Sequence, residues 1–144
     1  GIRDVLGSLG SEMCIRDRTN MISFLHMDFE FTDERGWLRQ LTHDTWKQVN
    51  VSQTKAGVFR GKHYHAHNRE AFYIISGEIE IFLEKDGEQR HLTVKNNDFF
   101  AIEPGTVHTF TFNQDTLMVI MYDKGIEEAN GIKDIYSQVQ NEKD

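Results

Sequence analysis

The sequence predicts an all-β protein folded as one closed double-sheet barrel, or jelly roll. From Phe29 onward, apolar and polar residues alternate with a period of two, which is typical of half-buried strands. Turn signals interrupt this alternation so often that about eight to ten short antiparallel strands fit between Phe29 and Asp123. Little room is left for helices, and closure of the sheets is the usual way to remove exposed strand edges.

The first predicted strands flank an Asp-Glu-Arg-Gly turn at residues 33–36, with Phe29–Phe31 before it and Trp37-Leu38 after it. A further strand is expected near Trp46–Ser52, and Gly57 begins another that leads to a group of histidines. The remaining predicted strands are Ala71–Ser76, Glu78–Leu83, Gln89–Val94, Thr109–Phe112 and Leu117–Tyr122.

The strand Glu78–Leu83 has the clearest pattern, because isoleucine or leucine occupies every second position and glutamate most of the others. Gly77, directly before it, predicts a bulge or a tight bend. Asp86-Gly87 after it predicts a two-residue hairpin. The polar tail that follows Gly125 contains one further element, a short helix expected around Lys133–Val139.

The composition is that of one acidic domain. Among 144 residues, 16 Lys and Arg oppose 23 Asp and Glu, so the formal charge is −7, and 38 % of the residues are hydrophobic. The acidic balance disfavours a nucleic-acid partner, and the absence of any run of about 18 apolar residues excludes a helical membrane span. A single cysteine cannot form an internal disulfide, and we expect a cytoplasmic protein.

Residues 1–20 differ from the rest of the chain, since they contain no aromatic residue. The segment Glu12–Arg18 resembles a translated sequencing-library adapter. We therefore expect residues 1–20 to be a non-native segment with the natural product starting at Met21; the alternative is a disordered extension. The predicted domain is then 21–144, with its core at about 29–123.

Candidate metal ligands gather in two stretches, 57–77 and 98–108. Alternate residues of a strand share a face, so His63 and His65 present two imidazoles side by side. Glu70 begins the next strand after a turn, and His108 follows a Pro-Gly turn at a strand entrance. Three imidazoles and one carboxylate suit a divalent transition metal such as zinc, iron, manganese or nickel. The alternative is that these histidines are exposed or are hydrogen-bonded core residues.

These residues resemble the two motifs of the cupins. The first motif is Gly, five residues, His-x-His, three or four residues, Glu, six residues and Gly, and it matches Gly57, His63, His65, Glu70 and Gly77. The second motif is Gly, five residues, Pro-x-Gly, two residues, His, three residues and Asn.

Gly105 and His108 match the second motif, but Glu103 stands at its proline position and Pro104 comes one place late. The resemblance covers about residues 29–123 and implies that the three histidines and the glutamate coordinate a metal inside a jelly-roll barrel.

A finer resemblance concerns cupins that act on nucleotide sugars, namely deoxysugar 3,5-epimerases and the cupin domain of capsular-polysaccharide assembly enzymes. It implies that His63 is the base that removes the proton beside a keto group. It also implies that Arg35 and Arg60 hold the nucleotide diphosphate, and that the chain forms a homodimer in which Arg35 reaches the partner's site. Glu70 stands where the epimerases carry a lysine, and this departure favours a metal-dependent reaction.

Three functions remain open. The leading hypothesis is epimerisation or isomerisation of a nucleotide-linked keto-sugar for surface-polysaccharide synthesis, with a histidine base and Tyr122 as a candidate general acid. The second is a metal-dependent dioxygenase or another small-metabolite metallocupin enzyme. The third is a non-catalytic cupin that binds a small ligand.

Overall fold

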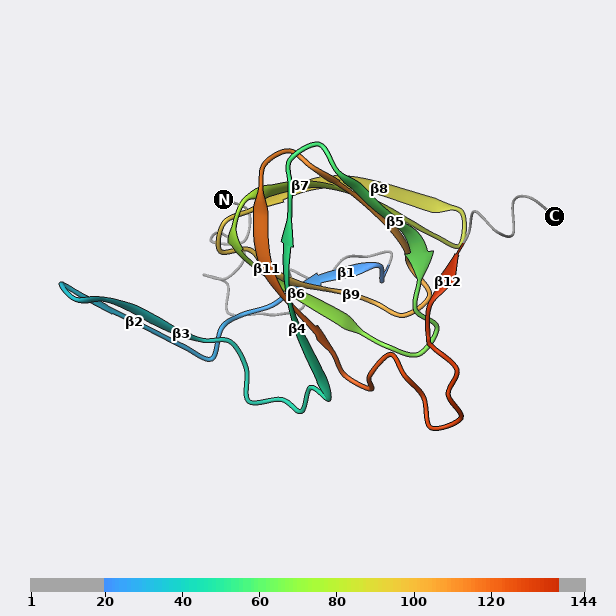
Figure 1. Ribbon diagram of the computed structural model, residues 1–144, viewed down its shortest axis with the longest axis horizontal. Helices are drawn as coiled ribbons and strands as arrows, with labels where there is room; N and C mark the ends of the chain where they lie inside the picture. Colours follow the sequence, from blue (N-terminus) through green and yellow to red (C-terminus); the bar gives the residue numbers. More distant parts are fainter. Residues whose placement is uncertain (1–19, 138–144) are drawn as a thin grey trace.

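Two five-stranded antiparallel sheets face each other and form the barrel that the alternation predicts (Figure 1). The computed structural model describes residues 20–137, and in this range it contains twelve strands and no helix. The strands of the first sheet, in spatial order, are β1 (Ile22–Phe24), β9 (Phe99–Ile102), β6 (Glu70–Ser76), β11 (Thr116–Tyr122) and β4 (Gln48–Thr54). Those of the second sheet are β12 (Tyr136–Ser137), β5 (Phe59–Tyr64), β10 (Val107–Phe112), β7 (Glu78–Lys85) and β8 (Glu88–Lys95).

The predicted boundary of the core at Phe29 was wrong. Strand β1 pairs with β9, and both Met21 and Ile22 are fully buried. Three residues are too few for a period-two pattern to be recognised, and for this reason the sequence did not reveal the strand. The predictions about the N-terminal segment concern residues 1–19 almost entirely, which lie outside the described residues.

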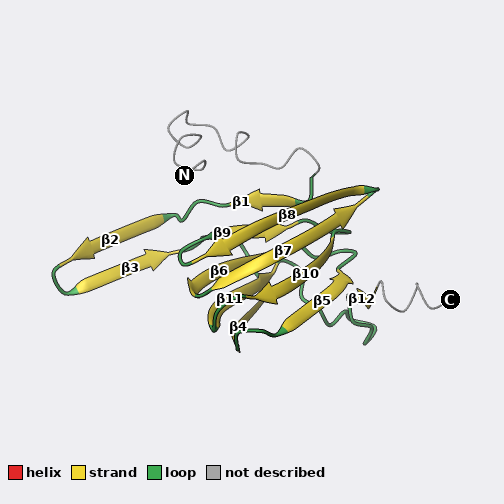
Figure 2. Ribbon diagram, turned by 90° about the horizontal axis from the view of Figure 1, so that it is seen from above, coloured by secondary structure: helices red, strands yellow, loops and turns green. Residues whose placement is uncertain are grey.

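Strands β2 (Phe29–Asp33) and β3 (Gly36–Gln40) form a separate hairpin, which we call the arm (Figures 1 and 2). The predicted turn at residues 33–36 joins them. The arm extends away from the barrel and is attached at its root, where Arg39 donates hydrogen bonds to Tyr73 and Asn97 of the barrel. The arm therefore adds no strand to either sheet of its own barrel.

The core lies between the two sheets. Alternation places Ile79, Ile81 and Leu83 of β7 inside, where they are at most 2 % exposed, as the sequence predicts. They meet Phe72 of β6 and Phe100 of β9, whose rings stack 5.2 Å apart. A second apolar cluster covers the outer face of the first sheet. For this reason β6, in the middle of that sheet, is buried on both sides over most of its length.

The turns follow the predicted chemistry, but the C-terminal segment does not. Asp86 and Gly87 both have positive φ in the β7–β8 hairpin, as a two-residue turn of this kind requires. The helix expected around Lys133–Val139 is wrong within the described residues, because residues 136–137 form β12 and pair with β5. Across residues 20–137, no helix is long and apolar enough to cross a membrane.

Candidate functional site

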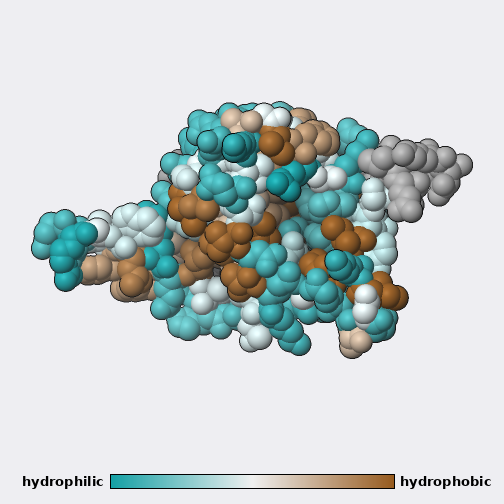
Figure 3. All heavy atoms as spheres, in the orientation of Figure 1, coloured by the Kyte–Doolittle hydropathy of each residue, from teal (hydrophilic) through white to brown (hydrophobic). Residues whose placement is uncertain are grey.

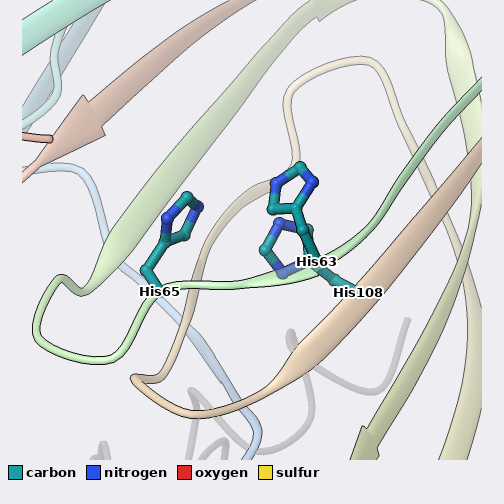
Figure 4. A group of neighbouring side chains, drawn as sticks. All are labelled: His63, His65 and His108. Atoms are coloured by element: carbon teal, nitrogen blue, oxygen red, sulfur yellow. The ribbon is translucent and has the colours of Figure 1, made fainter. Parts of the chain in front are cut away.

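Three neighbouring segments from both sheets bring the four predicted ligand residues together. His63 lies near the end of β5 and His65 directly beyond it, while His108 lies on β10 opposite His63. Glu70 is the first residue of β6, in the other sheet. Figure 4 shows the three imidazole rings facing a common space. The predicted strand positions hold for His63, Glu70 and His108, whereas His65 lies one residue beyond the end of β5.

A close approach of β5 to β10 sets the positions of these histidines. Gly61 has φ +111°, and a Cβ on it would lie 2.6 Å from the backbone oxygen of His108. A side chain here would push the two strands apart, so only glycine permits this approach. The pairing also shifts register between His108 and Thr109, which is the irregularity of a β-bulge. Gly61 is a site residue that the motif comparison did not single out.

The Glu70 carboxylate is the centre of the cluster. Its Oε1 lies 3.0 Å from Nε2 of His65 and 3.3 Å from Nε2 of His108. Its Oε2 accepts a hydrogen bond of 2.7 Å from the Tyr122 hydroxyl. All four side chains are buried, so these contacts are made with little access to water.

The pKa values of Glu70, His65 and His63 are shifted in different directions by their surroundings. Burial alone would raise the pKa of Glu70, but the hydrogen bonds from His108 and His65 outweigh it and lower the pKa far below its usual range. The same contact raises the pKa of His65, although burial opposes this. His63 has no such contact, and burial together with His108 and His65 lowers its pKa to about 4. His63 is therefore a neutral imidazole at pH 7.

The donor set fits a divalent transition metal. Metal–ligand bonds of about 2.1 Å at ordinary coordination angles place neighbouring donor atoms about 3.0–3.4 Å apart. The two distances from Glu70 to the histidine nitrogens lie in this range. The ring nitrogens of His63, His65 and His108 also group within 4.8 Å of one another. Imidazole and carboxylate together suit zinc, iron, manganese and nickel. That these residues bind a metal remains a prediction.

The cluster forms part of the wall of a cavity of about 450 Å³ inside the barrel. Arg60 and Tyr122 line this cavity; their roles in substrate binding and catalysis stay predictions. Burial and the Glu70 carboxylate raise the pKa of Tyr122, so its hydroxyl keeps its proton at neutral pH. Arg35 does not line the cavity: it lies at the tip of the arm, 79 % exposed and paired with Asp33. The sequence predicts that Arg35 reaches a partner's site rather than the cavity of its own chain, and a single chain does not test this prediction.

Sequence reasoning missed the contribution of residues 126–135. This segment also lines the cavity, through Ile126, Glu127, Lys133 and Ile135. Turn signals at Gly125 and at Asn130-Gly131 mark its bends, but nothing in its polar composition indicates that it folds back onto the barrel. Ile126 is held there by its backbone N–H, which donates to the Gln48 side chain at the start of β4.

The family described as "Polysaccharide biosynthesis C-terminal domain" matches residues 31–130, which include all four residues of the cluster. The chain belongs to this family. Comparison with curated proteins gives no significant match.

The solved structures that share the fold of this chain include three proteins, namely a ketoisomerase, an epimerase and a capsular polysaccharide assembling protein. The sugar 3,4-ketoisomerase QdtA from Thermoanaerobacterium thermosaccharolyticum, in complex with TDP, has a TM-score of 0.69 at 13 % identity, over 83 % of this chain and 90 % of that one. The dTDP-4-dehydrorhamnose 3,5-epimerase from Sulfolobus tokodaii has a TM-score of 0.57 at 19 % identity, over 70 % and 74 %.

The third neighbour is the capsular polysaccharide assembling protein CapF from Staphylococcus aureus, with a TM-score of 0.56 at 24 % identity. The match covers 76 % of this chain but only 32 % of CapF. At these identities the likenesses establish the fold alone, which is the all-β antiparallel jelly-roll barrel that the sequence predicts.

Proposed function

We propose that this chain is an epimerase or isomerase of nucleotide-linked keto-sugars in polysaccharide biosynthesis, and that it uses a divalent metal held by His65, Glu70 and His108. The observation that carries the proposal is the meeting of a neutral base, His63, with this donor set on one cavity wall. Its family membership and the sugar-nucleotide enzymes that share its fold support the substrate class.

Each side chain has a task in the reaction. His63 is neutral and less buried than the other two histidines, so it can accept the proton beside a keto group. A divalent cation bound at the site would act as a Lewis acid that polarises a carbonyl oxygen. Tyr122 lines the cavity with its hydroxyl protonated, and it can donate this proton to the substrate after His63 has removed another. Arg60 offers the paired N–H groups that bind a diphosphate.

Isotope exchange tests this proposal. In heavy water, nucleotide-linked 4-keto-6-deoxy sugars should exchange the proton at C3 or C5 for deuterium. His63→Asn should slow the exchange by about 10²-fold or more, as expected for the loss of a general base. Arg60→Ala should raise KM and have little effect at saturating substrate. No exchange by a folded, metal-loaded wild-type protein would overturn the proposal.

Elemental analysis tests the metal separately. The protein purified without chelators should carry up to one transition-metal ion per chain, and the His65→Ala/His108→Ala variant should carry none. Equal metal content in the two proteins would contradict the assignment of these ligands.

One observation favours a second candidate function, an iron-dependent dioxygenase. Two histidines and one carboxylate that surround a common point, as His65, His108 and Glu70 do, form the donor set of non-haem iron oxygenases. The two functions differ in their need for oxygen. Deuterium exchange that proceeds under strict anaerobic conditions supports the isomerase, and turnover that consumes oxygen and requires iron supports the dioxygenase.

We also propose a homodimer formed through the arm. Phe29, Phe31 and Leu38 lie on one face of the arm, and each is about half exposed. Figure 3 shows this hydrophobic patch behind a hydrophilic tip. Val51, 69 % exposed on the edge strand β4, is an apolar surface on which a second copy's arm can pack. Since the arm leads away from its own cavity, Arg35 can contribute only to a partner's site.

A further inference from the structure

A buried carboxylate outside the metal cluster holds the loop that follows His65. Asp134 is completely buried. Its Oδ1 accepts a hydrogen bond from the backbone N–H of Ala66 (2.8 Å), and its Oδ2 accepts those of His67 (3.0 Å) and Asn68 (2.9 Å). The Asn68 side chain donates a fourth, at 2.8 Å. Successive N–H groups that converge in this way form an anion nest, which repays the desolvation of the carboxylate.

The backbone of the same residue contacts the His65 ring directly. The carbonyl oxygen of Asp134 lies 2.7 Å from Nδ1 of His65. A carbonyl can only accept a hydrogen bond, so Nδ1 must carry the proton. Nε2, on the other side of the ring, donates its proton to the Glu70 carboxylate at 3.0 Å in the metal-free protein, and a bound cation would take the place of that proton. One residue thus fixes both the loop that follows His65 and the orientation of its ring.

We propose that Asp134 is a positioning residue, which sets the tautomer and direction of His65 so that Nε2 is available to a divalent cation. Histidines that bind metals commonly donate their second N–H to a carbonyl or carboxylate, which fixes the ring and strengthens the ligand. The inference rests on the proposed function only for what Nε2 binds; the tautomer follows from the contacts of Asp134 alone.

Asp134→Asn tests this positioning role. The variant keeps the size of the side chain but replaces one acceptor oxygen by an NH₂ group, which cannot accept a hydrogen bond from the backbone N–H that faces it. Asp123→Asn is the matched control. Asp123 accepts a hydrogen bond from the backbone N–H of Arg69 in the same loop, at 2.9 Å, whereas the ring nitrogens of His65 contact Asp134 and Glu70. Affinity for Co²⁺ would be measured from its visible absorption, and affinity for Zn²⁺ by competition with a coloured chelator.

We expect Asp134→Asn to weaken the affinity for both cations by about 10–100-fold. The variant keeps the backbone carbonyl but weakens the side-chain contacts that hold it against His65, and loss of such a partner usually has an effect of this size. Asp123→Asn should bind as the wild type does. A purely structural role would lower the melting temperature of Asp134→Asn and leave the cation affinity of the folded protein unchanged, which would overturn the inference.

Nitrogen NMR of the metal-free wild-type protein measures the tautomer of His65 directly and needs no variant. At a pH where imidazoles are neutral, Nδ1 of His65 should carry the proton. A proton on Nε2 instead would overturn the inference even if Asp134→Asn fails to fold. A wild-type protein that binds neither Co²⁺ nor Zn²⁺ would overturn the proposed metal and the cation-binding part of this inference, whereas the NMR result reports on the tautomer alone.

Discussion

Replacing Gly77 by alanine is expected to destabilise the barrel far more than the same change at Gly57. Gly77 joins β6 to β7 with φ +126°, a conformation that other residues rarely adopt. A Cβ at this position would overlap the Thr116 hydroxyl and lie 2.7 Å from the Thr116 Cα. Rotation of the threonine side chain cannot relieve a contact with its backbone, and Thr116 is fully buried and paired with β4.

Comparing Gly57 with Gly77 separates the cost of backbone strain from the cost of steric overlap. At Gly57, φ is +86° and no atom lies within 4 Å of the Cβ position, so alanine costs only backbone strain, about 1–2 kcal/mol. At Gly77, strain of about 1–3 kcal/mol is joined by overpacking of about 1–3 kcal/mol, which gives about 2–6 kcal/mol in total. At roughly 4 °C per kcal/mol, the melting temperature should fall by about 4–8 °C for Gly57→Ala and by about 8–24 °C for Gly77→Ala.

Thermal unfolding of the three proteins, followed by circular dichroism at one concentration and with chelator present, measures these shifts. An insoluble Gly77→Ala protein would represent the upper end of the expected effect. A Gly77→Ala protein that melts at or above the temperature of Gly57→Ala would refute the reasoning, since it would mean that β6 and β11 can separate without loss.

In the metal-free protein, acid should remove the stabilisation that Glu70 provides. Its pKa in the folded state lies below the unfolded value of about 4.3, so the contribution is complete above that pH and is lost as the pH falls toward the folded value. Urea midpoints between about pH 6 and about pH 3 should therefore fall more steeply for the wild type than for Glu70→Gln, and parallel curves would contradict this. Phe31→Asp combined with Leu38→Asp should convert the proposed dimer to a monomer, as measured by light scattering. The urea midpoint of the monomer should not fall, because the arm adds no strand to the barrel. A wild-type protein that is already monomeric would reject the dimer. Tyr122→Phe should lower kcat by about 10²-fold or more while its metal content stays near that of the wild type, and an unchanged kcat would exclude Tyr122 as the proton donor.

The barrel and the four-residue cluster could be predicted because their signals are local. The alternation of β7 and the Asp86-Gly87 turn each lie within a few residues, and each is confirmed. The spacing of His63, His65 and Glu70 follows from strand parity and one turn. Even His108, which lies far along the chain, follows a recognisable Pro-Gly turn.

The parts that could not be predicted depend on contacts between distant segments. Asp134 contacts residues 66–68 earlier in the chain, and no pattern around it differs from that of an exposed polar tail. The sequence of the arm reads as two ordinary strands, and only the pairing of β2 with β3 alone shows that they leave the barrel. The position of Arg35 therefore depended on topology, which local patterns do not contain.

The cluster also connects the two halves of the fold. His63 and His108 belong to the second sheet, Glu70 to the first, and His65 to the loop between them. A cation held by His65, Glu70 and His108 would therefore join the two sheets, and binding that is specific to the folded state stabilises it by about 2.7 kcal/mol at a free concentration of 100 Kd. Asp134 fixes the same loop from the C-terminal segment, which lines the cavity as well. Closure of the cavity, orientation of His65 and cohesion of the sheets thus depend on one small set of buried polar contacts, and a change at any of them should alter both stability and cation affinity.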